Sequence, residues 1–586
     1  MDTFVLNAIT QELQQQICLA KINHIAQPDE QGVILGLWRR GQELRLAISV
    51  DARYQYLFLT QQPAPNQVFN FGKFLQHHIK NAEIRAIQKP LLERMITFDL
   101  VKKDIDGQDL RFSLILEIMG RYSNLILINQ DTNKILDSLQ HVTAVQSSYR
   151  RIAPGADYVP PPPQEKEELL NIDRSRFQQI LADYKQEVHT STSVCLWKFL
   201  IQRISGLSPL LSKEIEGTHL DTSAEARWQR LSEVIRIVRE GTYQPTLVLE
   251  QTLQGKQQPL ALSAIPLAEL PYGKTCDVKT PDSMNAAAEE YYTILVERQR
   301  YDTLKAALMQ PLTARLAKVR KKREHLLAQK QESDQTEVYK RQGELITTNL
   351  YQLSKGMNSA KVIDYYSEDQ RLIEIPLDPK FTPAQNAQRY FKRYNKLKQG
   401  SVMTEQRLAA TEQELAYLEE VQFFVEEAQD LHDLHQLRAE MDAATPSKLK
   451  KKSGSKSEPA TPSQPFLRFV SSDGFDIYVG RSSRENDLLT QRTALPEDIW
   501  LHVHQAPGSH VLILNRERKT PVPEQTLREA ASLAAYHSKL RRSGRVDVIY
   551  TPKKYVRKPK GSPPGLVIVQ EFQTLRVIPQ ADLSAK

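Results

Sequence analysis

Cysteine is nearly absent from this chain, with only 3 among 586 residues. Cys18, Cys195 and Cys276 lie far apart, which excludes a disulfide scaffold and a CxxC zinc ribbon or finger. The sequence has no run of about 18 apolar residues, so a transmembrane helix is also excluded. The first residues lack the basic start and apolar core of a signal peptide. We therefore expect a protein of a reducing compartment, the cytoplasm, with no membrane partner.

Motifs of common enzyme classes are missing too. The chain contains no GxxxxGK[ST], GxGxxG, HExxH or GxSxG. Ser123 has no neighbouring base, and Ser509 beside His510 lacks a third, orienting group. We expect no catalytic residue, no cofactor and no metal site.

Positive charge gathers near the C-terminal end. The net charge is +8, and residues 465–586 hold 19 lysines and arginines against 12 aspartates and glutamates. Residues 443–464 add five lysines against one glutamate. A basic segment on a nearly neutral body suits a polyanionic partner, although a solvated lysine-rich tail would have the same composition.

The length predicts several domains, because one hydrophobic core rarely grows past roughly 250–300 residues. We predict a multidomain α+β protein. Its expected parts are 1–163 (an α+β domain with a sheet core), 164–284 (a mostly helical region), 285–442 (a coiled-coil hairpin with a tip), 443–464 (a flexible basic linker) and 465–586 (a compact α+β module). A four-proline run, Pro160–Pro163, marks the first boundary.

Short β-rich segments between turn residues predict the strands of both sheets. In the first domain these are Val33–Trp38, Glu43–Ser49, Tyr54–Thr60, Arg94–Val101, Asp109–Glu117 and Asn124–Asn129. In the last module they are Phe466–Val470, Asp476–Val479, Ile499–His504, Val511–Leu514, Asp547–Tyr550 and, closing the sheet, Leu566–Val569. Helical spacing predicts helices over Glu165–Ile180, Val194–Ile204 and Pro523–Leu540.

Two long segments, Tyr301–Gln331 and Met403–Met441, have almost no glycine or proline. The spacing of Leu408, Leu415 and Leu418 suits the apolar seam of a coiled coil. We predict an antiparallel hairpin whose arms reach about 60 Å at 1.5 Å per residue. An ordinary helical bundle is the alternative.

Three segments could contact nucleic acid. The turn Ile204–Pro209 between two short helices is typical of a helix-hairpin-helix, whose backbone N–H groups hold phosphate, although a plain helical corner has the same pattern. In Glu117–Asn124 an apolar strand runs into a Gly-Arg-Tyr-Ser-Asn turn that could grip phosphate and stack a base, although an ordinary β-turn would have the same residues.

The third segment, Tyr550–Gly565, interleaves five basic residues with tyrosines and has no acid. These cations, which we predict to bind RNA phosphate, are Lys553, Lys554, Arg557, Lys558 and Lys560. A solvated loop is the alternative. The pair His502 and His504, with His510 nearby, could contact RNA, hold a metal or be structural.

These motifs together resemble the NFACT family, which includes bacterial fibronectin-binding-protein-A-like proteins and the eukaryotic nuclear export mediator factor group. The resemblance rests on "EIMGRYSN", "RIAPGADYVPPP", "ISGLSPLLSKEI", "LDPKFTPAQNAQRYFKRYNKLK" and "DIWLHVHQAPGSHVLI", and it spans essentially the whole chain. It implies a glycosylase-like N-terminal domain, a helix-hairpin-helix region, a coiled coil and an RNA-binding-type C-terminal domain.

The resemblance also implies a function. Such proteins bind large ribosomal subunits stalled with peptidyl-tRNA, recruit tRNA (alanine tRNA is expected) and direct template-free alanine tailing of the nascent chain for degradation. Peptide-bond chemistry then belongs to the ribosome. The implied partners are ribosomal RNA, the stalk-base protein at the coiled-coil tip, tRNA and an S4-type RNA-binding helper protein.

Family tRNA-contact positions map onto Glu93, Arg94, Glu117, Ile118, Met119, Arg121, Ser123 and Asn124. Glu93 is one methylene longer than the family aspartate. Two alternatives remain: a fibronectin-binding surface adhesin, and a repair enzyme of the formamidopyrimidine-DNA-glycosylase type. The chain begins Met1–Asp2–Thr3 rather than with the catalytic proline of such glycosylases, which argues against the latter.

Overall fold

A computed structural model of the chain describes residues 1–64, 67–143, 145–190, 195–251, 257–268, 276–333, 336–444, 466–516 and 521–581. The chain forms two compact units, Met1–Gln299 and Arg300–Lys586. The predicted basic linker lies outside the described residues from position 445 onward.

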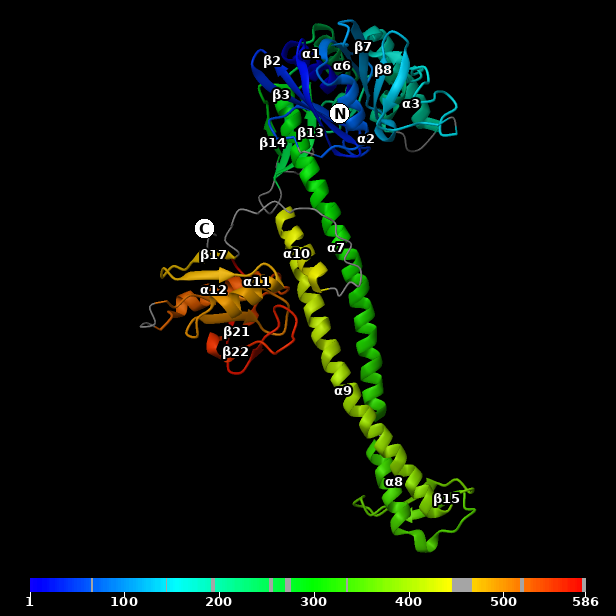
Figure 1. Cartoon of the computed structure of the whole chain (residues 1–586), viewed down its shortest axis with the longest axis vertical. Coiled ribbons are helices and arrows are strands. Elements are labelled where there is room, and N and C mark those ends of the chain that lie inside the picture. Colours follow the sequence, from blue (N-terminus) through cyan, green and yellow to red (C-terminus); the bar gives the residue numbers. More distant parts are fainter. Residues whose placement is uncertain are drawn as a thin grey trace. The chain divides into compact units, whose positions relative to one another are not determined.

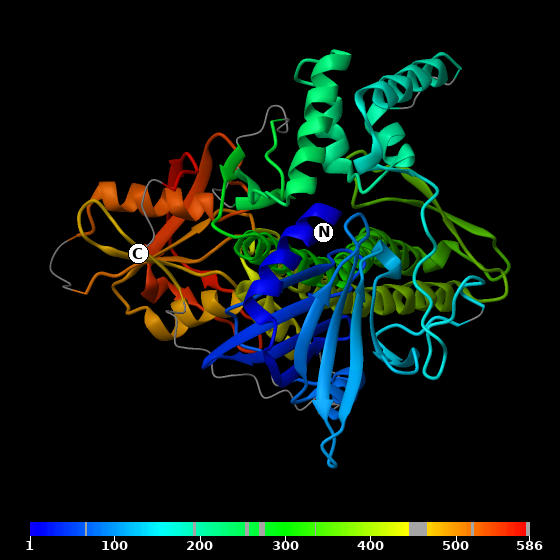
Figure 2. The same ribbon diagram turned by 90° about the horizontal axis from the view of Figure 1, so that it is seen from above.

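The first unit is built on an antiparallel sheet whose described strands run in the order β4-β3-β2-β1-β5-β6-β7-β8-β9, seen as dark to light blue arrows in Figure 1 and Figure 2. The strands are β1 (Lys21–Asp29), β2 (Gly32–Arg39), β3 (Gln42–Ser49), β4 (Tyr56–Leu59), β5 (Glu83–Gln88), β6 (Met95–Lys103), β7 (Asp109–Glu117), β8 (Asn124–Asn129) and β9 (Lys134–Ser138). The six predicted strands of this domain are confirmed, and β7 and β8 have the predicted bounds.

Helix α1 (Thr3–Ile17) begins at Asp2, whose carboxylate accepts hydrogen bonds from the N–H groups of Phe4 and Val5. Such a cap satisfies backbone donors that the first turn leaves unpaired. The helix contacts β4 and β5, and helix α2 (Asn70–Ile79) contacts β1. The apolar residues of α1 join the core formed by the sheet.

The segment after the proline run differs from its mostly helical prediction. Its helices are α3 (Arg174–Thr190), α4 (Leu196–Arg203), α5 (Pro209–Glu216) and α6 (Ala224–Glu240); its strands are β10 (Glu167–Glu168), β11 (Ile204–Ser205), β12 (Thr246–Gln251), β13 (Gln257–Ser263) and β14 (Cys276–Lys279). The start of the predicted helix Glu165–Ile180 is therefore wrong, because α3 begins at Arg174. Asp173 accepts a hydrogen bond from the N–H of Arg176 at 2.7 Å, which fixes the first turn there.

Strands β12, β13 and β14 form an antiparallel ladder that the sequence analysis missed. The apolar residues of β12 are all buried, so they show no alternation that would separate a strand from a helix.

Helix α7 (Met284–Ser333) begins in the first unit and continues in the second, where Pro311 lies inside it. There it lies beside α9 (Pro383–Glu427), as Figure 1 shows in green and yellow. Arg323 pairs with Glu412 at 3.4 Å and Lys330 with Glu405 at 3.2 Å. Partner numbers fall along α9 as they rise along α7, so the predicted antiparallel hairpin is confirmed. Helix α10 (Leu431–Ala444) follows α9 and adds Leu434 and Leu437 to the same apolar cluster.

A small tip joins the two arms (Figure 1). It contains α8 (Thr336–Thr348) and the antiparallel strands β15 (Ser359–Ile363) and β16 (Leu372–Pro376). Their apolar residues form a cluster with Ala387 of α9. Helix α9 begins at Pro383, and Thr382 and Gln385 form a capping box at this start.

The C-terminal module is an α+β domain whose described strands run in the order β17-β18-β20-β19-β21-β24. Its elements are β17 (Leu467–Val470), β18 (Asp476–Val479), α11 (Ser483–Leu488), β19 (Ile499–Val503), β20 (Val511–Ile513), α12 (Glu524–Tyr536), β21 (Val546–Pro552), β22 (Val556–Arg557), β23 (Ile568–Val569) and β24 (Gln573–Val577). Residues Leu566–Val569 do not close the sheet as predicted. Strand β23 pairs with β22 in a separate ladder, and β24 takes the edge position beside β21.

Candidate nucleic-acid interface

Two segments singled out from the sequence meet at one end of the first sheet. Strand β6 begins directly after Glu93 and Arg94, and β7 ends at Glu117. Met95 is opposite Glu117, and the N–H of Ile118 donates to the carbonyl of Arg94 at 2.9 Å. Antiparallel pairing therefore places Glu93–Arg94 beside Ile118–Met119, although 25 positions separate the two pairs in the sequence.

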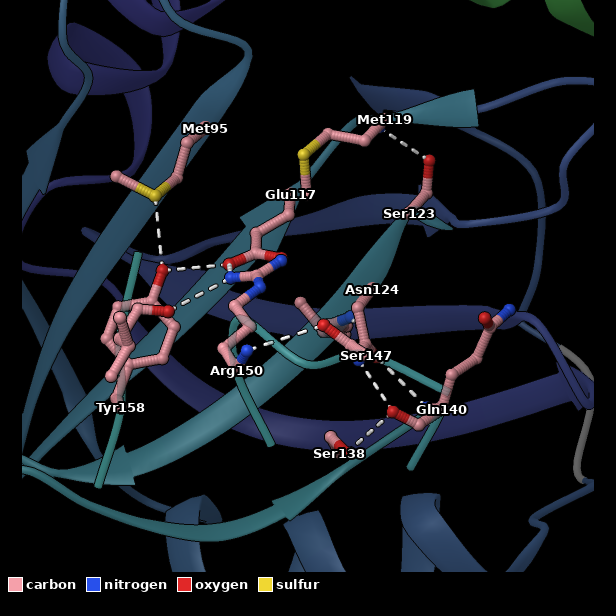
Figure 3. Close-up of polar contacts among 12 residues, drawn as sticks. Met95, Glu117, Met119, Ser123, Asn124, Ser138, Gln140, Ser147, Arg150 and Tyr158 are labelled. Carbon is pink, nitrogen blue, oxygen red and sulfur yellow. Dashed lines mark hydrogen bonds and ion pairs between the residues drawn. The ribbon is translucent and has the colours of Figure 1, made fainter. Parts of the chain in front are cut away.

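Glu117 lies inside the protein in an ion pair (Figure 3). Its side chain is 0% exposed, and that of Arg150 is 10% exposed. The guanidinium donates to both carboxylate oxygens, at 2.7 and 2.6 Å, and the Tyr158 hydroxyl donates to the same carboxylate at 2.9 Å. Burial and the Glu117 charge raise the pKa of Tyr158 well above its usual range, so the phenol keeps its proton. Glu117 consequently holds the loop Arg150–Tyr158 against the sheet.

The turn after β7 is fixed by its own polar side chains (Figure 3). The Ser123 hydroxyl accepts from the N–H of Met119 at 2.8 Å and donates to the carbonyl of Gly120 at 2.7 Å. Asn124 donates to the carbonyl of Gln140 at 2.7 Å and accepts from its N–H at 2.9 Å. Ser123 and Asn124 are both buried, as is Ile118, so these residues shape the turn from within.

Exposed groups of the same turn could reach a ligand. Arg121 is exposed, and its guanidinium lies 4.7 Å from the ring centre of Tyr122, which is 61% exposed. Met119 is half-buried. A cation beside an exposed ring can contact a phosphate and stack a base.

A cleft of about 580 Å³ adjoins this sheet end and brings in the turn between α4 and α5. Glu93, Arg94 and Lys166 line it together with Gly206–Leu210. Gly206 has φ +84°, and a Cβ there would lie 3.1 Å from Leu92, so glycine permits this close approach. The Ser208 hydroxyl donates to the Asp2 carboxylate at 3.1 Å and accepts from the N–H of Leu211. These two hydrogen bonds join the starts of α1 and α5.

Lys89 is a residue near this cleft that no sequence pattern singles out. Its ammonium donates to the carbonyl of Pro90 at 3.0 Å. Burial lowers the pKa of Lys89 to about 7, against the charges of Glu93 and Asp2, which raise it. A lysine that is only partly charged at neutral pH gains charge when a polyanion approaches.

The five predicted phosphate contacts of the C-terminal module differ in their surroundings. We call the segment Lys553–Lys560 the cation loop. Lys554, Arg557 and Lys560 are exposed, and Lys553 is half-buried. Lys558 forms an ion pair with Asp487 of α11, and Lys554 lies 3.6 Å from Glu497. Lys558 thus anchors the loop, while the three exposed cations face solvent.

The histidines near the sheet centre separate into two places. His502 and His510 contact each other with ring centres 5.4 Å apart, and both contact Trp500. His504 instead contacts Phe572. Burial lowers the pKa of His502 to about 4 and that of His510 well below its usual value. Among the described residues no cluster of metal-binding side chains is found.

No helix within the described ranges is long and apolar enough to span a bilayer.

Comparisons with known proteins cover nearly the whole chain. Residues 2–459 match the family described as NFACT N-terminal and middle domains, and residues 465–570 match the NFACT protein RNA binding domain. A Bacillus subtilis (strain 168) protein named Rqc2 homolog RqcH is 31% identical over 581 residues, covering 99% of this chain and 98% of that protein. Its namesake from Streptococcus suis (strain 05ZYH33) is 30% identical over 588 residues, with the same coverage.

A solved structure of the N-terminal part of the fibronectin/fibrinogen-binding protein from Streptococcus suis is 26% identical, with a TM-score of 0.40. The match covers 50% of this chain and 99% of that one.

Proposed function

Because the chain belongs to the NFACT family, we infer that it is a ribosome quality control factor that binds RNA. Similarity over the full length to proteins named Rqc2 homolog RqcH carries this inference. The C-terminal module carries exposed cations in the cation loop, on which polyanions can bind. In the N-terminal cleft, Arg94 and Lys166 supply cations beside the acids Asp2 and Glu93.

For the N-terminal unit we propose a division of labour within the predicted tRNA site. Glu93, Arg94, Met119 and Arg121 contact tRNA, because each has accessible surface. The remaining members of the predicted set, Glu117, Ile118, Ser123 and Asn124, are buried and hold the contact residues in place. The close pairing of the two strand ends supports this assignment.

The finer features follow as proposals from the family resemblance. The chain acts in the cytoplasm as a scaffold without chemistry of its own. It recruits tRNA, with alanine tRNA favoured, to stalled large subunits, where the ribosome adds a template-free alanine tail. The coiled-coil tip reaches the stalk base, an S4-type helper protein assists, and the N-terminal domain has a glycosylase-like fold.

Capture of the tagged protein from cells with stalled translation tests this function. The bound RNA is sequenced. We expect large-subunit ribosomal RNA and enriched tRNA, with little small-subunit RNA. Capture of neither RNA, at salt low enough to keep ribosomes bound, would overturn the proposal.

Variants separate the tRNA site from the ribosome contact. Arg94→Ala and Arg121→Ala should deplete tRNA and leave ribosomal RNA bound. Arg85→Ala is the matched control, because Arg85 is an exposed arginine on β5 that pairs with Glu83 and does not line the cleft. Equal tRNA loss in all three variants would contradict a specific site.

A further inference from the structure

The end of α9 and the whole of α10 are strongly acidic. Residues 415–444 hold eight aspartates and glutamates against one arginine, Arg438. We call this segment the acidic stem. The C-terminal module has the opposite balance, with 19 lysines and arginines against 12 acids over residues 465–586. Opposite charges favour contact between these two parts of the second unit.

Two arginines of the module form ion pairs with the acidic stem. The Arg481 guanidinium donates to the Asp433 carboxylate at 3.3 Å, and that of Arg541 donates to the Glu427 carboxylate at 3.0 Å. Asp433 lies on α10 and Glu427 ends α9, so both helices of the stem take part. The stem therefore supplies anions to cations that would otherwise face solvent.

Helix α11 joins these contacts to the cation loop. The backbone N–H of Arg484, near the start of α11, donates to the Glu440 carboxylate at 3.3 Å. Asp487, further along the same helix, pairs with Lys558 of the cation loop. One helix thus carries contacts to the stem and to the loop. The arginines that contact the stem, which we call the arginine face, are Arg481, Arg484 and Arg541.

The contact between stem and module is polar. Buried apolar residues of the stem, such as Leu418 and Leu434, cluster with Leu312 of α7, whereas those of the module cluster among themselves. No apolar cluster joins the two parts within the ranges that the structure describes. Arg481 and Arg541 keep 25% and 35% of their side chains exposed, and ion pairs open to water contribute little free energy. Such an interface permits the two parts to separate.

The same contact buries carboxyl groups of the stem. Glu420 accepts a hydrogen bond from the Asn486 amide at 2.9 Å, and Glu440 is 5% exposed. Burial raises the pKa of Glu420 to about 8 and raises that of Glu440 above its usual value. At neutral pH each group must take up a proton or keep its charge away from water, and either costs free energy. This cost weakens the binding of the stem to the module.

We propose that the arginine face binds the phosphates of RNA, and that the acidic stem covers this face while RNA is absent. The proposal rests on the inferred RNA-binding function and assigns it a second phosphate-contact surface. Carboxylate and phosphate groups both accept paired hydrogen bonds from an arginine guanidinium, so stem and RNA compete for the same cations. Because α11 joins the arginine face to the cation loop, one RNA strand can contact both.

Removing the competing carboxylates tests the proposal. Binding of a labelled rU12 oligonucleotide to the full-length protein is measured, since phosphate contacts need no particular base. Glu427→Gln/Asp433→Asn should bind at least about threefold more tightly than the parent, because a larger fraction of the molecules has the arginine face free. Glu426→Gln/Asp442→Asn removes the same charge from exposed positions of the stem that do not pair with the module among the described residues. This control should bind close to the parent affinity, and an equal gain in both variants would overturn the proposal.

The arginines provide a second test. Arg481→Gln/Arg541→Gln should lower the slope of log affinity against log salt by about 1.4, at about 0.7 per lost phosphate contact. In this background the stem substitutions should give no further gain. Arg528→Gln/Arg576→Gln is the matched control, because these exposed arginines pair with acids inside the module and should leave the slope unchanged. A slope that is the same in both variants would refute the arginine face as an RNA surface.

Hydrogen exchange of the parent protein reports the change of partner without any substitution. Addition of rU12 should slow exchange in the cation loop and speed exchange in α10, which loses the cover of the module. Exchange in α10 that stays constant or slows, under conditions in which the loop is protected, would refute the competition.

Ribosome capture keeps the two conclusions apart. If the parent captures large-subunit RNA while the stem variant and its control bind rU12 equally, the arginine face fails and the ribosome function stands. If the parent captures no ribosomal RNA, the proposed function itself fails.

Discussion

Replacing Arg150 distinguishes an internal role of Glu117 from direct contact with tRNA. Arg150→Met would leave the Glu117 carboxylate, which is 0% exposed, with the Tyr158 hydroxyl as its remaining side-chain hydrogen-bond partner among the described residues. Removal of one partner of a buried ion pair costs about 3–5 kcal/mol. We expect that loss of stability at the end of the sheet, with loss of tRNA binding as a consequence.

Hydrogen exchange of the full-length protein is the appropriate assay, because the chain has two units and need not unfold in one step. A loss of 3 kcal/mol increases the opening equilibrium roughly 100-fold. Amides of β7 and β8 should therefore exchange at least about 100-fold faster in Arg150→Met, while those of the coiled coil stay unchanged. The double variant Glu117→Met/Arg150→Met should recover most of the protection, since apolar residues can replace a buried pair.

The opposite pattern would refute this reasoning. If Glu117→Gln abolished tRNA binding with unchanged exchange, and Arg150→Met bound tRNA normally, Glu117 would contact RNA directly. The position of Arg150, 33 residues from Glu117 in sequence, makes it a useful probe, because the family resemblance assigns it no RNA contact.

Three further predictions concern charge. Arg94→Ala should weaken tRNA affinity about tenfold in a binding titration and leave stability within about 0.5 kcal/mol, while Arg85→Ala changes neither. Neutralising the three exposed cations of the cation loop should lower the slope of log affinity against log salt by about 0.7 per lost phosphate contact, whereas Lys558→Gln should mainly speed exchange in the loop. Since the pKa of Glu420 is raised from 4.5 to about 8, its stabilising effect is fully present below pH 4.5 and is lost as the pH rises to about 8. Exchange of α9 amides, corrected for the intrinsic rate, should therefore show protection falling over this range, and the fall should be smaller in Glu420→Gln.

Local patterns predicted those strands whose burial alternates or whose ends have clear turn residues. Strands β7 and β8 agree with prediction because a glycine turn and polar residues separate two apolar runs. Leu566–Val569 looked like a sheet strand because it is apolar, yet it follows a proline-rich loop and pairs only with β22. Pairing partners depend on the tertiary structure, and a short apolar run does not specify them.

The candidate site was only partly visible in the sequence for the same reason. The motif around Glu117 was recognisable, but its partners Arg150 and Tyr158 lie 33 and 41 residues away. No local signal indicates that this carboxylate is buried. Similarly, the place of the Glu420 carboxylate on α9 depends on Gly565, because a Cβ there would lie 2.6 Å from one of its oxygens. Gly565 lies on a distant loop that reads from sequence only as basic and proline-rich.

The proposed division between holding and contacting residues predicts that side-chain length can vary at one part of the site and not at the other. Glu93 is exposed, so one methylene beyond the family aspartate extends into solvent and needs no rearrangement of the core. Glu117 has no such freedom, because both of its oxygens receive hydrogen bonds from Arg150 inside the protein. Shortening it would withdraw the carboxylate from a fixed guanidinium and leave buried donors unsatisfied.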